Sequence, residues 1–169
     1  MGLSAIMAAR VIGCNPIIAV DVHDHRLELA KELGATHVIN GRTTDTVAEV
    51  RLITGIGVPY AVETTGVAAV VKQSLAALKP LGVVAIIGFT GEVSLNIQNE
   101  LMAEGKSMIG VIEGDSIPKI FIPQLIALYK QGKFPFDRLV QFYELDQINQ
   151  AFEDSASGAV IKPILHLNG

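Results

Sequence analysis

Hydrophobic positions along the chain follow two spacings, one typical of amphipathic helices and one typical of short buried strands. The clearest helical pattern spans residues 66–78, where Val67, Val71 and Leu78 fall on one face. The clearest strand spans residues 83–87, which are apolar at every position, as in strands that are covered on both faces.

These two patterns alternate from one end of the chain to the other. Helices are expected at residues 3–11, 25–33, 43–54, 66–78, 118–130 and 146–154. Strands are expected at residues 17–20, 36–39, 60–63, 83–87, 106–112, 138–142 and 160–167. Alternating helices and strands are typical of parallel sheets built from right-handed crossovers. The pattern therefore predicts an α/β fold, with an open parallel sheet and helices on both of its faces.

Composition narrows the class of protein further. The chain has 169 residues, enough for one domain, or for one domain and part of a second. Hydrophobic residues make up 50% of the chain and charged residues only 18%, a balance that excludes intrinsic disorder. The formal net charge of −4 gives no attraction to a phosphate backbone, so a nucleic-acid partner is not expected.

Two further features bear on location and on metal sites. The longest apolar runs have strand length, well below the ~20 residues of a membrane-spanning helix, and the N-terminus lacks the pattern of a signal peptide. We therefore expect no membrane association and a cytoplasmic location. Cys14 is the only cysteine, which excludes an intrachain disulfide and a cysteine-built zinc cage.

An acidic residue ends the first apolar strand. Asp21 follows residues 17–20, and a carboxylate at this place in a dinucleotide-binding sheet accepts hydrogen bonds from the adenosine ribose and repels the 2′-phosphate of NADP. Gly2 precedes Asp21 by a spacing that fits the third glycine of the phosphate-binding fingerprint. The alternative is an aspartate that caps a helix or lies in a loop.

Several short motifs stand in order along almost the whole chain. They are Gly2-Leu3-Ser4, the strand that ends at Asp21, Leu33-Gly34-Ala35-Thr36, Glu63-Thr64-Thr65-Gly66, residues 82–88 and the tail at 152–167. This set resembles the cofactor domain of the zinc-containing medium-chain alcohol dehydrogenases. Residues 110–116 and 129–136 are similar to the aryl- or benzyl-alcohol dehydrogenase branch of that family. The resemblance implies a Rossmann-like sheet and NAD as the cofactor.

The resemblance also implies a role for particular residues. Met1 and Gly2 would present backbone N–H groups to the pyrophosphate at a helix N-terminus. Asp21 would hold the adenosine ribose, with Arg26 near the ribose and the adenine. The residues that would lie beside the cofactor and line its nicotinamide end are Thr64, Thr65, Ile87, Gly88, Val111 and Glu113.

Parts of the family pattern are absent from this chain. In the family, a strand and two more glycines precede the third glycine, and a separate catalytic domain carries Cys, His and Glu zinc ligands. The expected sheet therefore lacks its first, central strand, and zinc is expected only in the full-length parent enzyme. We expect no catalytic and no metal-binding residue in this chain. His23 and His25 are expected to be solvated histidines in a loop; the alternative is that they bind a metal ion adventitiously.

Residues 1–116 are expected to form a truncated dinucleotide-binding domain. Residues 117–169 would form a C-terminal helix and return segment that packs on the absent catalytic domain. A missing central strand leaves backbone N–H and C=O groups unpaired. We expect the gap to be filled by residues 160–167 or by a segment of another copy, or to be closed by the two neighbouring strands.

Met1 replaces a valine of the family pattern, so a mis-started reading frame is a further hypothesis.

The leading functional prediction is the cofactor-binding part of an NAD-dependent alcohol dehydrogenase, inactive as this chain alone. In the parent enzyme, hydride would pass between a primary, aromatic alcohol and NAD⁺. The alternative is a non-catalytic module that binds nucleotide or self-associates; an unrelated methyltransferase is disfavoured because no glycine-rich loop follows a first strand.

The resemblance also implies a homo-oligomer in which residues 106–112 of two copies pair with each other. The alternative is that residues 106–112 form an ordinary edge strand, protected from pairing by Lys106.

Overall fold

The computed structural model describes residues 1–167, and the chain divides into two compact units, Met1–Ile126 and Ala127–Gly169. The boundary expected after Ser116 therefore lies inside the first unit. Helix α6 (Pro118–Lys130) crosses the division and matches the helix expected at residues 118–130. Within residues 1–167, no helix is long and apolar enough to cross a membrane.

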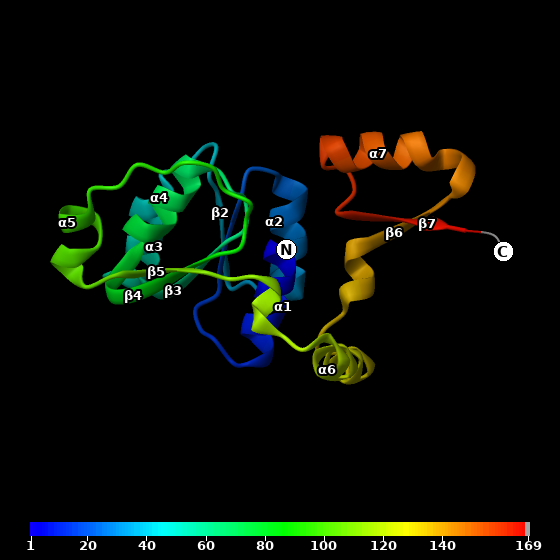
Figure 1. Cartoon of the computed structure of the whole chain (residues 1–169), viewed down its shortest axis with the longest axis horizontal. Helices are drawn as coiled ribbons and strands as arrows, with labels where there is room; N and C mark the ends of the chain where they lie inside the picture. The colour runs from blue at the N-terminus through cyan, green and yellow to red at the C-terminus, as the bar shows by residue number, and fades with distance from the viewer. Residues whose placement is uncertain (168–169) are drawn as a thin grey trace. The chain divides into compact units, whose positions relative to one another are not determined.

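The first unit contains two separate parallel sheets (Figure 1). One has the order β1-β2, with Ile18 opposite His37 and Asp21 opposite Asn40. The other has the order β3-β4-β5. The elements are α1 (Gly2–Val11), β1 (Ile18–Asp21), α2 (Asp24–Leu33), β2 (His37–Asn40), α3 (Thr46–Thr54), β3 (Val58–Glu63), α4 (Ala68–Ala76), β4 (Leu78–Ile86), α5 (Ile97–Glu100), the 3-10 turns η1 (Met102–Glu104) and η2 (Glu113–Asp115), and β5 (Ser107–Gly110).

Helices cover both sides of the β1-β2 sheet because neighbouring residues of β1 point to opposite faces. Ala19 packs in a cluster with Ala30 of α2, and Leu3 and Ile6 of α1 pack against that cluster. Ile18, on the other face, packs against a cluster that contains Val50 of α3. The same cluster reaches Val58 of β3, so α3 lies across both sheets. The expected parallel fold with helices on both sides is confirmed.

The gap left by the expected central strand is not filled in either of two ways expected from the sequence. The expectation that residues 160–167 fill the gap is wrong for this chain, because β7 (Lys162–His166) pairs with β6 (Val140–Glu144) in the second unit. The expectation that the neighbouring strands close up is also wrong, since β1 pairs only with β2 and β3 only with β4 among residues 1–167. These strands stay apart while α1 and α3 pack against both sheets.

Three element boundaries also differ from those expected. The helix expected to continue to Leu78 ends at Ala76, and Leu78 begins β4 by pairing with Val58. Pro80 therefore lies within β4 instead of ending a helix. Helix α3 begins at Thr46 and not at Thr43, because the Asp45 side chain caps it by accepting hydrogen bonds from the Val47 and Ala48 N–H groups at 3.0 and 3.1 Å.

The second unit is built around the parallel pair β6-β7 and helix α7 (Ile148–Ser157). The 3-10 turns η3 (Phe136–Leu139) and η4 (Leu145–Gln147) precede β6 and α7, so Arg138 lies in a turn and not in the strand expected there. Tyr143, Ala151 and Val160 form its buried cluster.

Candidate functional site

Asp21 ends β1 with its side chain held in one position. Its Oδ1 atom accepts hydrogen bonds from the Val22 and His23 N–H groups at 2.8 and 3.0 Å. Its carbonyl oxygen accepts from the Gly41 N–H at 3.1 Å, so the turn after β2 lies beside it. The carboxylate is therefore fixed, half-buried, at the carboxyl edge of the sheet, which is where open parallel sheets bind ligands.

The turn after Asp21 is fastened to the end of β2. Asn40, the last residue of β2, donates from Nδ2 to Asp24 Oδ1 at 2.6 Å. Arg26, half-buried, lies one residue further into α2 than His25, whose ring is 5.6 Å from that of His23. Arg26 therefore follows the Asp21 turn directly, on the helix that packs on β1.

The N-terminus of α1 lies beside the segment that follows β3. Met1 is the N-cap and Gly2 the first helical residue. A Cβ atom on Gly2 would stand 3.3 Å from Thr64 Oγ1, so these two segments, distant in the sequence, are in contact. Because the first N–H groups of a helix have no partner within the helix, they are suited to bind a phosphate.

The segment after β3 is held by a buried carboxylate. Glu63 is only 2% exposed. Its Oε1 atom accepts hydrogen bonds from the Thr65 N–H at 2.7 Å and the Thr65 hydroxyl at 2.5 Å, and its Oε2 atom accepts from the Gly66 N–H at 3.1 Å. Glu63 is not among the cofactor residues expected from the sequence. The only signal available was an acid at the end of an apolar strand, directly before Thr-Thr-Gly.

Strands β3 and β4 end side by side, and the segments after them touch. The Glu63 carbonyl oxygen accepts hydrogen bonds from the Ile87 and Gly88 N–H groups at 2.9 and 3.2 Å. A Cβ atom on Gly88 would collide with the backbone nitrogen of Gly66, so only glycine fits there. The Val111 N–H donates to the Ile86 carbonyl at 3.0 Å, which brings Val111 to the same edge.

The structure therefore brings most of the expected cofactor residues together in two groups. Asp21 and Arg26 lie at the β1-β2 edge. The group at the α1 start and the β3-β4-β5 edge consists of Met1, Gly2, Thr64, Thr65, Ile87, Gly88 and Val111. Glu113 stands apart in η2 with a φ of 50°, and its carbonyl accepts the Ser116 hydroxyl at 2.8 Å within that turn.

The two groups of residues fit a dinucleotide but not a metal ion. A free helix N-terminus, a fixed carboxylate at a strand end and glycines at the closest backbone contacts are suited to a pyrophosphate, a ribose and a flat ring. Among residues 1–167, no three His, Cys, Asp or Glu side chains lie close enough to hold a metal.

Solved structures of other proteins share the fold of this chain. The benzyl alcohol dehydrogenase of Acinetobacter calcoaceticus matches with a TM-score of 0.94 and 50% identity, covering 99% of this chain and 47% of that one. A zinc-binding-domain alcohol dehydrogenase protein from Burkholderia ambifaria matches with the same TM-score, 0.94, and 50% identity, over 99% of this chain and 46% of that chain.

Sequence comparison agrees with the structural comparison. The geraniol dehydrogenase of Castellaniella defragrans is 34% identical over 169 residues, which cover 98% of this chain and 45% of that protein. The chain thus spans about half the length of the relatives that it matches. The family model described as zinc-binding dehydrogenase matches residues 1–131, and this region is the NAD-binding part of zinc-type alcohol dehydrogenases. The chain belongs to the zinc-binding dehydrogenase family.

Proposed function

We propose that this chain supplies the NAD site of an alcohol dehydrogenase that moves hydride between a primary, aromatic alcohol and NAD⁺. NAD, when bound, is the hydride acceptor. The single observation that carries the proposal is the match, at a TM-score of 0.94 over 99% of the chain, to a benzyl alcohol dehydrogenase. The aromatic substrate class rests on the 50% identity to that enzyme.

The residues of this chain would bind and orient the cofactor. The N–H groups at Met1 and Gly2 would bind the pyrophosphate, while Asp21 would accept hydrogen bonds from the ribose hydroxyls. Val111 and the segment after β4 would lie against the nicotinamide through their backbone atoms. None of these groups polarises an alcohol, so the chain alone is expected to lack dehydrogenase activity.

The second candidate function is a module that binds nucleotide or self-associates without catalysis. It is favoured by the division between β1 and β3, both edge strands in the described part of the chain. Unpaired strand edges pair readily with another chain. An oligomer formed by a segment of another copy at these edges belongs to this second candidate.

Oligomerisation through β5 belongs to the main proposal. Strand β5 is the last in its sheet, and Ile109 and Ile112 are 47% and 81% exposed. The Lys106 side chain, expected to protect this edge in the alternative, is only 6% exposed and binds Glu104 at 2.7 Å. Lys106 therefore does not present a solvated charge that would protect the β5 edge. This supports pairing of β5 with a second copy.

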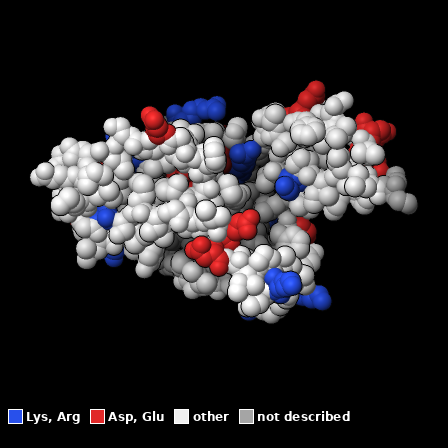
Figure 2. Space-filling view, viewed as in Figure 1, with Lys and Arg blue, Asp and Glu red and all other residues white. Residues whose placement is uncertain are grey.

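Other expectations about partners and location stay predictions. On the face shown in Figure 2, Lys and Arg side chains are scattered among uncharged residues and form no continuous basic surface there. This supports the expectation that nucleic acid is not a partner. The cytoplasmic location also stays a prediction from the sequence.

Calorimetric titration of the chain with NAD⁺ tests the proposed function. We expect a dissociation constant below about 1 mM, which corresponds to roughly 4 kcal/mol of binding free energy. The absence of binding heat would overturn the NAD site and favour the self-associating module. Sustained formation of reduced cofactor from benzyl alcohol and NAD⁺ by the chain alone would overturn the expected inactivity.

A further inference from the structure

Glu63 is the most deeply buried charged side chain at the cofactor edge, and its partners are all neutral groups. It is 2% exposed, and the hydrogen bonds to its carboxylate come from the N–H groups of Thr65 and Gly66 and from the Thr65 hydroxyl. Burying a carboxylate costs free energy unless oriented donors replace its water. Adjacent N–H groups that point at one anion supply that replacement.

The donors explain why the residue is an acid and not an amide. Oε1 receives both the N–H and the hydroxyl of Thr65, and the Gly66 N–H is shared between Oε2 at 3.1 Å and Oε1 at 3.3 Å. A glutamine at this position would place its NH₂ group against one of these donors. The donor–donor contact would release either Thr65 or Gly66, because a buried donor without an acceptor is unfavourable.

The Thr65 hydroxyl both donates and accepts a hydrogen bond in this arrangement. It donates to Glu63 and accepts a hydrogen bond from the Val67 N–H at 3.1 Å, at the start of α4. The neighbouring hydroxyl, on Thr64, instead lies beside Gly2. The two threonines predicted to contact the cofactor therefore differ: Thr65 supports the backbone, and Thr64 is the one directed to the start of α1.

Glu63 joins the segments that would meet the cofactor. Its side chain fixes residues 64–66, and its carbonyl oxygen accepts hydrogen bonds from Ile87 and Gly88. Gly66 in turn lies so close to Gly88 and Phe89 that a side chain on either glycine would collide. A shift of the Glu63 carboxylate would thus move both segments together.

We propose that Glu63, acting through Thr65 and Gly66, is a positioning residue that sets the affinity for the pyrophosphate–nicotinamide portion of the dinucleotide. The inference rests on the proposed NAD site. Glu63 itself is not expected to contact the cofactor. The effect of Glu63 is confined to the β3-β4 edge, so the adenosine portion, held at Asp21 on the other sheet, should bind independently of Glu63.

The test compares Glu63→Gln with the wild-type chain in titrations with NAD⁺ and with adenosine. Adenosine lacks the pyrophosphate and the nicotinamide, so it reports on the Asp21 group alone. We expect Glu63→Gln to weaken NAD⁺ binding about 10-fold, as for loss of a charge-assisted hydrogen bond, with adenosine affinity unchanged. Glu153→Gln is the matched control, since Glu153 is exposed in α7 and belongs to neither cofactor group, and it should change neither affinity.

A second pair of variants keeps the test decisive if Glu63→Gln fails to fold. Thr65→Val removes the hydroxyl and should weaken NAD⁺ binding, whereas Thr65→Ser retains the hydroxyl and should restore it. Equal NAD⁺ affinity in wild type, Glu63→Gln and Thr65→Val would overturn this inference alone. Parallel loss of NAD⁺ and adenosine binding in a folded Glu63→Gln would also overturn it, and absence of NAD⁺ binding by the wild type would overturn the proposed function with it.

Discussion

Gly2, the first residue of α1, lies against the hydroxyl of Thr64, and a Cβ atom on Gly2 would stand 3.3 Å from Thr64 Oγ1. The contact joins a helix that packs on the β1-β2 sheet to the end of a strand in the other sheet. A side chain at Gly2 must therefore push Thr64 aside or move the start of the helix. The helix start and the β3 edge thus depend on each other for position.

Gly2→Val is expected to weaken NAD⁺ binding. Its branched side chain would overpack the contact with Thr64, a change that typically costs about 1–3 kcal/mol. Titration calorimetry measures the loss, and adding Thr64→Ala to Gly2→Val should recover part of it by making room. If Gly2→Val binds NAD⁺ as tightly as the wild type, the helix start does not meet the cofactor.

Gly88→Ala is expected to destabilise the first unit and to disturb the segments after β3 and β4. The new methyl group would collide with the Gly66 backbone, which cannot rotate away as a flexible side chain can. We expect a loss of about 1–3 kcal/mol in the free energy of unfolding, measured by urea denaturation. Gly91→Ala is the control, because no atom lies within 4 Å of a Cβ atom there. Equal stability of the two variants would contradict the close contact.

Much of the fold could be predicted from hydrophobic spacing, and the errors have identifiable causes. The order of helices and strands follows from the periodicity, which reports which face of each element is buried. Leu78 was misassigned because its apolar side chain continues the helical stripe, while its backbone pairs with Val58. Thr43 lies outside α3 because the side chain that caps the helix belongs to Asp45, two residues further along the chain.

The candidate site was only partly predictable for a different reason. Asp21 stands at a strand end, a place that the local pattern identifies. The role of Glu63 depends on the turn of the chain that brings Thr65 and Gly66 over its carboxylate, and that turn has no periodic signal. The contacts of Gly2 with Thr64 and of Gly66 with Gly88 join segments distant in the sequence, so no local pattern specifies them.

Asp21→Ser is expected to change the choice between NAD⁺ and NADP⁺. Removing the carboxylate removes an acceptor for the ribose hydroxyls, worth about 1.5–3 kcal/mol for a charged group, and also removes its repulsion of a 2′-phosphate. Titrations should show weaker NAD⁺ binding and a higher ratio of NADP⁺ to NAD⁺ affinity. Asp146→Asn, exposed in the second unit, is the control. An unchanged ratio in Asp21→Ser would contradict the assignment of Asp21 to the ribose.

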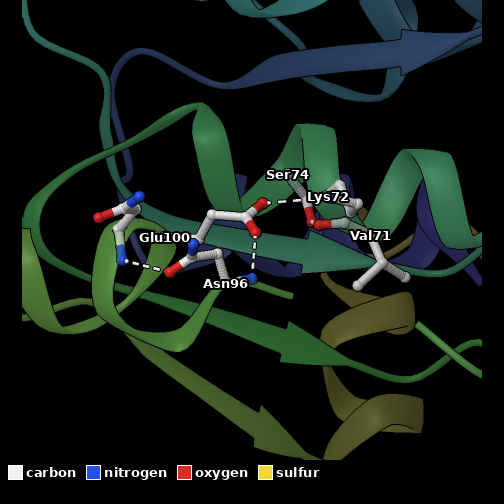
Figure 3. A network of polar contacts seen from close by, with 6 residues as sticks. Val71, Lys72, Ser74, Asn96 and Glu100 are labelled. Carbon is white, nitrogen blue, oxygen red and sulfur yellow. Dashed lines mark hydrogen bonds and ion pairs between the residues drawn. The ribbon is translucent and has the colours of Figure 1, made fainter. Parts of the chain in front are cut away.

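Glu100→Gln is expected to loosen α5 from α4. Glu100 accepts a hydrogen bond from the Asn96 N–H at 2.6 Å through Oε2 and contacts Lys72 Nζ of α4 at 3.5 Å through Oε1 (Figure 3). Asn96 Oδ1 in turn accepts from the Asn99 N–H at 3.0 Å, so the short helix is held from both ends. Hydrogen exchange of residues 96–100 should become faster in the variant, and Glu92→Gln should leave it unchanged.

The same interaction predicts a pH dependence for α5. The Asn96 backbone hydrogen bond, followed by Lys72, lowers the pKa of Glu100 below its ordinary value. A lowered pKa means that the stabilisation is present above the ordinary value and is lost as the pH falls through the lowered one. Protection of residues 96–100, relative to the intrinsic exchange rate at each pH, should therefore fall on acidification in the wild type. An equal loss of protection in Glu100→Gln would show that another group is responsible.

Tyr143→Phe is expected to destabilise the second unit at neutral pH. The buried Tyr143 hydroxyl donates to Asp154 Oδ2 at 2.7 Å, and this bond ties β6 to α7. Hydrogen exchange of residues 148–166 should become faster in the variant. Tyr60→Phe is the matched control because Tyr60 is 74% exposed.

The hydrogen bond between Tyr143 and Asp154 also sets the direction of a pH effect. The bond to Asp154, together with burial, raises the pKa of Tyr143 above its ordinary value, because ionisation would abolish the donated bond and place two negative charges together. A raised pKa means that the stabilisation is complete below the ordinary value and is lost as the pH rises through the raised one. Residues 148–166 of the wild type should thus lose protection in strong alkali beyond the intrinsic rise in exchange rate. The Tyr143→Phe chain, which has no proton to lose there, should show only the intrinsic rise; an identical loss of protection in both chains would mean that the bond does not hold the second unit together.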